Sequence, residues 1–259
     1  MSALFSYWTG PITWMERLAV ASAQAVGHEI TVYSPIPGLL AHEGRLGCKI
    51  MHGREVFDDP SLERLRTEHP AHYTDHFRLA GLQQGLGTWI DLDLIFLKPL
   101  PEDSYIYGWE AAGSINNAVL RLPEASAVLA EYRAFIATRP FNVPWHPLSD
   151  RIRRRIKQVT HPLQGKKQVA PTLGPPVLTR FLTRHGLHRL AKAQDVFYPV
   201  AYGDVKRLHE PGFVEERLTP RTIAVHLWHS RFRKVYGPDM PSISWLQAQA
   251  ARLSLAAAA

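Results

Sequence analysis

The amino-terminal segment carries the pattern of a strand, a helix and a second strand. Residues 4–8 are a short apolar run that ends in a turn at Gly10, and residues 12–26 place apolar side chains at helical spacing. Gly27, a residue type that commonly ends a helix, follows, and residues 29–33 form the second apolar run. A strand-helix-strand unit of this kind predicts an α/β fold, in which helical crossovers connect the strands of a sheet.

The length and composition fit such a fold. At 259 residues we expect a single domain, residues 1–259, with a frayed alanine tail at 254–259, and a hydrophobic fraction of 46% excludes a disordered chain. Cys48 is the only cysteine, which rules out an intrachain disulfide and a cysteine metal cluster and fits a reducing compartment. The sequence has no signal-like start and no run of about 18 apolar residues. We therefore expect a cytoplasmic protein, at the inner face of the membrane if it contacts lipid.

The formal net charge of +7 indicates anionic partners without choosing among them. The densest basic cluster consists of Arg151, Arg153, Arg154, Arg155, Lys157, Lys166 and Lys167. The simplest interpretation of this cluster is a solvated helix face and loop. A peripheral contact with an anionic membrane surface or acceptor is the next. No nucleic-acid-binding motif accompanies the charge, so we expect no nucleic-acid partner.

Two aspartates, Asp91 and Asp93, interrupt a later apolar run at residues 87–96. An unpaired ionised carboxylate is costly to bury, so the pair requires a partner or a ligand. If the run is a strand, side chains alternate between its faces and both carboxylates point to the same one. Two acidic oxygens side by side at a strand end suit a hard divalent cation such as Mg²⁺ or Mn²⁺. The pair therefore predicts a cation site.

A helix is predicted just before this run. Thr74 or Asp75 is a suitable N-cap, apolar residues follow at helical spacing, and Gly85 ends the pattern. Asp75 and Arg78 lie three residues apart, so they share one face of the first turn. Ligands of open α/β sheets collect beyond the carboxyl ends of strands and near helix N-termini, which places both residues in one crevice with the aspartate pair. Alternatively, Asp75 only caps the helix and Arg78 is its surface partner.

Two stretches, Tyr73-Thr74-Asp75-His76-Phe77-Arg78 and Gly87-Thr88-Trp89-Ile90-Asp91-Leu92-Asp93, together resemble the DxD sugar-binding region of glycosyltransferase family thirty-two. Its relatives include capsular polysaccharide transferases, yeast initiating mannosyltransferases and clostridial toxin glucosyltransferases. Trp89 takes the family's aromatic position, and the sixteen-residue spacing from Asp75 to Asp91 is that of the family. Leu86 in place of a first glycine and Thr74 in place of serine are mild departures.

Four further segments resemble landmarks of the same family, in the same order. They are the first strand and turn at residues 5–10, an asparagine-containing strand at 115–120, a Gly-Pro turn at 173–175 and a His-x-Trp strand end at 224–228. Residues 239–259 carry the pattern of a final helix without a chemical signal. Because the landmarks cover nearly the whole chain, the resemblance is more specific than a lone DxD pair.

The resemblance implies a GT-A fold, a Rossmann-like mixed sheet flanked by helices, and a transferase that uses a nucleotide-diphosphate sugar. It assigns the metal, Mn²⁺ or Mg²⁺, to Asp91, Asp93 and His226. It assigns the donor sugar to Asp75, Arg78, Asp91, Asn116 and Asn117. The nucleotide is expected to contact Trp8, Gly10, Trp228 and Arg231. Some of these residues have a simpler alternative: Trp8 and His226 are also suitable core residues, Arg231 is a suitable surface charge, and Asn116 or Asn117 a suitable turn residue.

The family is usually retaining, and in that case the leaving phosphate itself accepts the acceptor's proton, so no catalytic base is assigned. We expect a UDP-linked hexose as donor and a glycan or glycolipid of polysaccharide biosynthesis as acceptor. Two other classes remain. A haloacid-dehalogenase-like phosphatase also carries Asp-x-Asp at a strand end, but near the N-terminus and with Thr or Val where Ile95 stands. A non-catalytic relative would bind a nucleotide sugar or polysaccharide without turnover.

Overall fold

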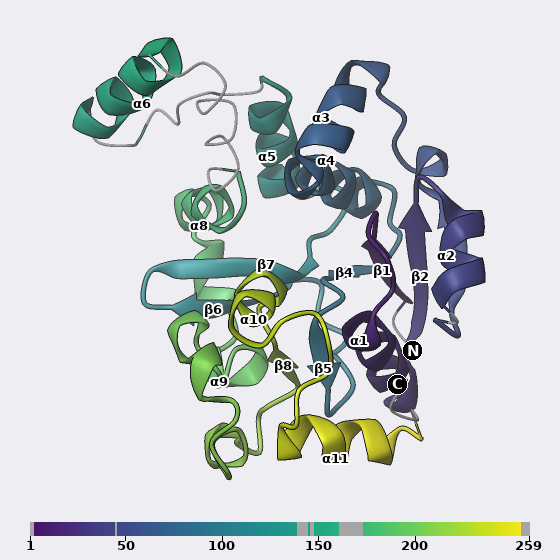
Figure 1. Ribbon diagram of the computed structural model, residues 1–259. Helices are drawn as coiled ribbons and strands as arrows, with labels where there is room; N and C mark the ends of the chain where they lie inside the picture. The colour runs from purple at the N-terminus through teal and green to yellow at the C-terminus, as the bar shows by residue number, and fades with distance from the viewer. Residues whose placement is uncertain (1–2, 45, 139–144, 146–147, 161–172, 255–259) are drawn as a thin grey trace.

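The computed structural model describes residues 3–44, 46–138, 145, 148–160 and 173–254 (Figure 1). Its strands are β1 (Ala3–Tyr7), β2 (Glu29–Ser34), β3 (Lys49–His52), β4 (Thr88–Ile90), β5 (Leu94–Phe96), β6 (Ile106–Ala111), β7 (Ser114–Arg121) and β8 (Ala224–His226). Its α-helices are α1 (Trp14–Ala25), α2 (Pro37–Gly44), α3 (Glu63–Glu68), α4 (Pro70–Gln83), α5 (Ala127–Ala137), α6 (Leu148–Thr160), α8 (Pro175–Arg184), α9 (Gln194–Phe197), α10 (His229–Tyr236) and α11 (Ser244–Arg252). In the described part of the chain, no helix has the length and apolarity needed to cross a bilayer.

The main sheet has six strands in the order β3-β2-β1-β4-β7-β6. β1 pairs in parallel with β2 and β4, and β2 with β3, whereas β7 runs antiparallel to both of its neighbours. A separate antiparallel pair joins β5 to β8, which lie far apart in the sequence. The predicted α/β architecture is therefore confirmed as a mixed sheet flanked by helices, an arrangement consistent with the GT-A-like fold that the resemblance implies.

The predicted strand-helix-strand unit is present at the amino terminus. Thr13 and Glu16 form a capping box at the start of α1. The Glu16 carboxylate accepts the Thr13 backbone N–H, and the Thr13 hydroxyl accepts a backbone N–H of the first turn, that of Met15. Gly27 follows the helix with φ of +89°, a conformation that glycine adopts at little cost. α1 thus leads directly into β2, which pairs in parallel with β1.

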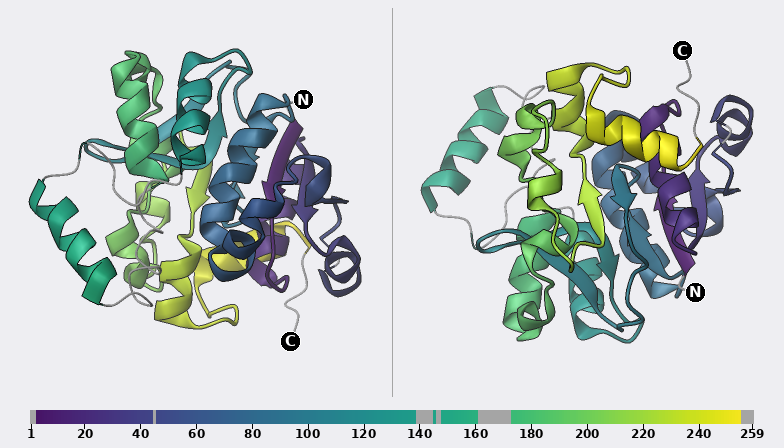
Figure 2. Two further views of the ribbon diagram at one scale, coloured as in Figure 1. Left: turned by 90° about the horizontal axis from the view of Figure 1, so that it is seen from above. Right: turned by 90° about the horizontal axis from the view of Figure 1, so that it is seen from below.

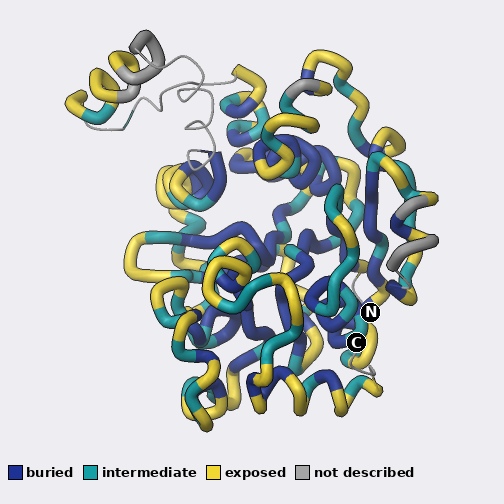
Figure 3. The backbone as a smooth tube through the Cα atoms, viewed as in Figure 1, coloured by how far each residue is buried: buried dark blue, intermediate teal, exposed yellow. Residues whose placement is uncertain are grey.

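Helices lie on both faces of the sheet (Figure 2). Each face has its own apolar core, because successive side chains of a strand point to opposite faces. Leu4 belongs to the core on the α1 side, and Phe5 and Tyr7 belong to the core that includes Phe77 of α4. Figure 3 shows the strands and the inner faces of these helices as buried, with exposed residues concentrated on outer helices and turns. The site described below lies where β1 and β4 end between these two layers.

Two predicted boundaries were wrong. α4 begins at Pro70 rather than at Thr74 or Asp75, because proline at the first helical position is preorganised for a helix start. Asp75 is therefore not an N-cap. It lies in the second turn of α4, and its side chain is buried. β4 ends at Ile90, so the aspartate pair occupies the turn between β4 and β5 and does not share a strand face.

The later predicted segments are found as β7, α8, β8 and α11. Of the predicted tail at 254–259, only Ser254 lies within the described residues, and Lys166 and Lys167 of the basic cluster also lie outside them.

Candidate functional site

Asp91, Asp93 and His226 converge at the carboxyl end of β4. The antiparallel pairing of β5 with β8 places Leu94 opposite His226, and the Leu227 N–H donates to the Asp93 carbonyl oxygen at 2.9 Å. One ligand atom from each of the three side chains lies within 4.8 Å of the other two. The structure thus brings together the three residues to which the resemblance assigned the metal.

Asp93 is buried, at 6% exposure, and both of its carboxylate oxygens have hydrogen-bond partners. One carboxylate oxygen lies 3.1 Å from His226 Nε2, and the other accepts the His229 backbone N–H, in the first turn of α10, at 2.7 Å. Burial opposes ionisation of Asp93, but the charge of His226 and these hydrogen bonds outweigh it and lower its pKa. Burial alone would lower the pKa of His226, but the negative charge of Asp93 and its hydrogen bond outweigh burial and raise that pKa. The two groups therefore favour the ion pair.

A second buried network lies directly behind Asp91. Arg78 donates to Asp75 at 2.6 Å and to Asp91 at 3.1 Å, and its guanidinium lies 4.6 Å from the centre of the Trp89 ring. The Trp89 indole N–H also donates to Asp91, at 2.7 Å. Burial raises the pKa of Asp75 to about 6 in spite of Arg78, since Arg78 serves two carboxylates and Asp91 adds negative charge. The hydrogen bonds from Arg78 and Trp89 fix the orientation of the Asp91 carboxylate.

The two asparagines of β7 point in different directions. Asn117 donates to Asp75 at 3.3 Å and so joins the Arg78 network. Asn116 donates to Glu110 of β6, and its side-chain oxygen accepts the Ala118 N–H at 2.7 Å. Of the two expected sugar-contacting asparagines, only Asn117 is connected to the site residues.

A cleft of about 500 Å³ opens in front of these groups. Its lining includes most of the predicted site residues: Trp8, Gly10, Arg78, Asp91, Asp93, His226 and Trp228. Trp8 donates its indole N–H to the Pro11 carbonyl at 3.1 Å, so its ring is held at the cleft edge against His229, with centroids 5.6 Å apart. Asp75, Asn116 and Asn117 do not line the cleft, and Asp75 lies behind Arg78.

Trp228 links the cleft wall to the metal-ligand candidates. Its backbone is left-handed, with φ of +58°, which is uncommon for a bulky residue and is found mainly where surrounding structure enforces it. Its indole N–H donates to the Val200 carbonyl at 2.8 Å, and its ring lies 4.3 Å from that of His226. Trp228 therefore restricts the His226 imidazole from one side.

Of the arginines of α10, Arg233 lines the cleft and Arg231 does not. Arg231 lies over the Tyr202 ring at 5.7 Å, and the cleft is lined by His229 and Arg233. Residues 229 and 233 lie four apart and share one face of α10, whereas residue 231 projects from the opposite face. The four-residue spacing of 229 and 233 is present in the sequence, but it points to Arg233 only when residue 229 is known to begin α10.

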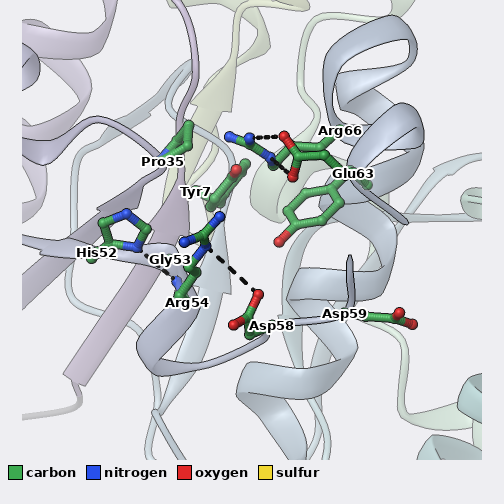
Figure 4. Close-up of a pocket in the computed structure, with 10 residues that line it drawn as sticks. Tyr7, Pro35, His52, Gly53, Arg54, Asp58, Asp59, Glu63 and Arg66 are labelled. Atoms are coloured by element: carbon green, nitrogen blue, oxygen red, sulfur yellow. Dashed lines mark hydrogen bonds and ion pairs between the residues drawn. The ribbon is translucent and has the colours of Figure 1, made fainter. Parts of the chain in front are cut away.

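A second cavity of about 200 Å³ shares Tyr7 with the cleft and lies at the ends of β1, β2 and β3 (Figure 4). Figure 4 shows Arg54 directed at Asp58, 3.6 Å away, and Arg66 directed at Glu63. Both cations are therefore compensated by carboxylates of the same cavity. The larger cleft lies within the roughly 300–1,000 Å³ of small-molecule sites and is lined by Asp91, Asp93 and His226, so we regard it as the principal site.

The Asp91–Asp93–His226 cluster fits a divalent cation. Two carboxylates and an imidazole are acceptable ligands for Mn²⁺, and Mg²⁺ prefers the oxygens alone. His226 Nε2 faces Asp93 at 3.1 Å, and its Nδ1 is buried without a hydrogen-bond partner among the described residues. A cation bound between Nε2 and Asp93 would replace the proton of the ion pair. All three side chains line the cleft, which leaves room for ligand oxygens from a bound substrate.

No family model and no curated protein matches the chain. Among solved structures, one described as "PaToxG Glycosyltransferase" is similar over 98% of this chain and 83% of its own, with 12% identity and a TM-score of 0.39. We infer nothing about activity from a likeness of that size. The function proposed for this chain rests on the residues of its site.

Proposed function

We propose that this protein is a metal-dependent glycosyltransferase. It moves a hexose from a nucleotide-diphosphate sugar, UDP-linked, to a glycan or glycolipid acceptor of polysaccharide biosynthesis, with retention of configuration. The observation that carries the proposal is the convergence of Asp91, Asp93 and His226 on the wall of a substrate-sized cleft. Two carboxylates and an imidazole that face open space suit a cation whose remaining ligands are diphosphate oxygens.

The residues divide the work between holding the cation and holding the donor. A cation bound at this cluster supplies the positive charge that neutralises the diphosphate leaving group. Asp93, fixed by His226 and His229, is the direct ligand, and Asp91 faces both the cation and the sugar. Arg78 reaches the cleft, so we assign the sugar hydroxyl contact to Arg78.

The remaining predicted residues act at the edges of the site. Asp75 and Asn117 lie behind Arg78 and position it, because neither lines the cleft. Trp8 and Gly10 also line the cleft, and the aromatic ring of Trp8 suits a nucleobase. Arg233 extends from α10 into the cleft lining and is the cation we assign to the diphosphate.

The phosphatase alternative requires a free carboxylate nucleophile. One oxygen of Asp91 already accepts hydrogen bonds from both Arg78 and Trp89, and Asp93 is engaged at both of its oxygens. Carboxylates held in this way suit cation binding better than nucleophilic attack. A binding protein without turnover remains the second candidate, since the same groups would bind a nucleotide sugar in either case.

The test is a panel of nucleotide sugars with Mn²⁺, scored by release of the nucleoside diphosphate with and without glycan acceptors. We expect one donor to be hydrolysed slowly alone and faster with an acceptor. Asp93→Asn should lower turnover by at least about 100-fold, since removal of one group that stabilises the leaving charge costs roughly this much. Asp58→Asn, an exposed carboxylate of the second cavity, is the matched control and should retain activity.

Three outcomes would contradict the proposal. If no nucleotide sugar binds or is turned over and Asp93→Asn equals the wild type, the transferase assignment fails. Tight donor binding without transfer to any acceptor would identify a binding protein. Release of phosphate from a phosphomonoester, independent of any nucleotide sugar, would identify a phosphatase.

A further inference from the structure

α6 carries an apolar stripe that is exposed to solvent. Leu148, Ile152 and Ile156 are 66%, 50% and 57% exposed, although large aliphatic side chains are usually buried. The three residues lie four apart, so at 3.6 residues per turn they fall within an arc of roughly 80°. They form one continuous stripe along the helix rather than three scattered contacts.

The position of α6 separates this stripe from the core of the protein. In Figures 1 and 2, α6 lies at the margin of the molecule, apart from the sheet and from the helices that cover it. Figure 3 shows its described residues as exposed or intermediate. An apolar stripe on a peripheral helix of this kind indicates an external binding surface.

The charges that border the stripe are positive. Arg151 and Arg155 are exposed, lie four apart, and project along one side of it. Arg153 lies beyond the other side, 79% exposed, with Asp150 at 3.1 Å. A narrow apolar stripe with arginines beside it is typical of helices that lie in the plane of a lipid interface.

We propose that α6 binds the surface of an anionic lipid bilayer. The side chains of Leu148, Ile152 and Ile156 enter the boundary between headgroups and acyl chains, and Arg151 and Arg155 contact lipid phosphates. A second copy of this chain fits less well, because a symmetric contact through the stripe would bring the same arginines together. The proposal does not rest on the proposed function, since lipid binding requires neither donor nor metal.

The test measures partition of the full chain, without nucleotide sugar, onto vesicles of phosphatidylcholine alone or with 30 mol% phosphatidylglycerol. We expect binding to the anionic vesicles, and binding that weakens as salt rises. Replacement of both isoleucines by serine, Ile152→Ser with Ile156→Ser, should lower the partition coefficient at least about tenfold. Arg151→Gln with Arg155→Gln should lower it by a similar factor, since each basic residue near an anionic surface contributes roughly fivefold.

Two variants guard against a loss of folding as the explanation. Leu190→Ser removes another exposed leucine, 47% exposed, and should leave binding unchanged. Asp150→Asn removes the acidic neighbour of Arg153 and should increase binding two- to fivefold. A general loss of folding would not leave binding unchanged in the first variant and raise it only severalfold in the second.

The proposal is overturned if the wild type ignores anionic vesicles, or if the isoleucine and arginine variants bind as the wild type does. Concentration-dependent dimers in light scattering that the isoleucine variant abolishes, without vesicle binding, would show that a second copy covers the stripe. Binding to a soluble acidic protein in place of anionic vesicles would assign it to a protein partner.

Discussion

Arg78 pairs with two carboxylates through one guanidinium; the side chains of Arg78 and Asp75 are buried, and that of Asp91 is 34% exposed. Its replacement by glutamine leaves Asp75 and Asp91 without their cation, and the loss of one partner from a buried ion network costs about 3–5 kcal/mol. We expect Arg78→Gln to lower the free energy of unfolding by about 3 kcal/mol, because Asp75 can take up a proton and relieve part of the cost. Urea unfolding followed by tryptophan fluorescence measures the difference.

The matched control is Arg66→Gln. Arg66 pairs with Glu63, whose side chain is 52% exposed, and ion pairs of this kind contribute about 0–1 kcal/mol. Equal losses of stability in the two variants would contradict the stabilising role assigned to the Arg78 network.

His72 provides a pH-dependent part of the stability. It is 2% exposed, its Nε2 has no hydrogen-bond partner among the described residues, and burial, with His69 nearby, lowers its pKa to about 4. As the pH falls below about 6.5, the unfolded chain takes up a proton at this histidine before the folded chain does. The stability present above pH 6.5 is therefore lost progressively towards pH 4, by about 1–2 kcal/mol after allowance for solvent screening.

His72→Leu should remove this dependence, since leucine does not titrate. Between pH 7 and 4.5, the urea midpoint of the wild type should fall relative to that of the variant, which measurements at pH 7, 5.5 and 4.5 check. Parallel curves over that range would contradict the assignment to His72.

Among the elements, β4 depends on the glycine that precedes it. Gly87 has φ of +112°, and a Cβ atom there would lie 2.1 Å from the Ala3 carbonyl oxygen of β1. Gly87→Ala should therefore destabilise the protein by about 2–5 kcal/mol, through both backbone strain and displacement of the strand that leads to Asp91. Thermal unfolding followed by circular dichroism measures the loss.

Gly27→Ala separates the two causes. Gly27 also has a positive φ, of +89°, but a Cβ atom there would meet nothing within 4 Å. We expect a loss of only about 1–2 kcal/mol, which is the cost of the left-handed conformation itself. A loss as large as that of Gly87→Ala would show that contact with β1 is unimportant.

Elements with a complete local pattern were predictable from the sequence, and those set by tertiary contacts were not. α1 has a capping box, an apolar face and a glycine after its end, so its position followed directly. β3 contains no fully buried residue and lies at the sheet edge, so no alternation of apolar and polar residues marks it in the sequence.

The site divides in the same way. The motif predicts that Asp93 and His226 bind a cation, and the structure brings the two side chains together. The choice between Arg231 and Arg233 depends on where α10 begins, which the left-handed backbone of Trp228 determines and local propensity does not reveal. The burial of Asp75 likewise depends on Pro70 as the start of α4.

For the whole molecule, the metal should act as a stabilising ligand. A ligand that binds only the folded state stabilises it by about 2.7 kcal/mol at 100 times its dissociation constant. In a chain of this size each kcal/mol raises the melting temperature by roughly 2–4 °C, so saturating Mn²⁺ should raise it by roughly 5–10 °C. Differential scanning calorimetry with Mn²⁺ and with EDTA measures the shift.

The shift should vanish in His226→Ala and persist in Asp58→Asn. An equal shift in the two variants would locate the metal elsewhere, and no shift in the wild type would remove the cation from the proposed mechanism.

The pairing of β5 with β8 has a consequence for biosynthesis. Asp93 and His226 lie 133 positions apart, so both aspartates leave the ribosome long before the imidazole that completes their site. Contacts of such long sequence separation form late, because the intervening chain must first be ordered. We expect ribosome-bound chains that stop before β8 to take up no more Mn²⁺ than ribosomes without a chain. The electron paramagnetic resonance signal of aqueous Mn²⁺ should fall below that baseline only for chains in which residue 226 has emerged. Metal uptake would then report that the β5–β8 pair has formed in a newly synthesised chain.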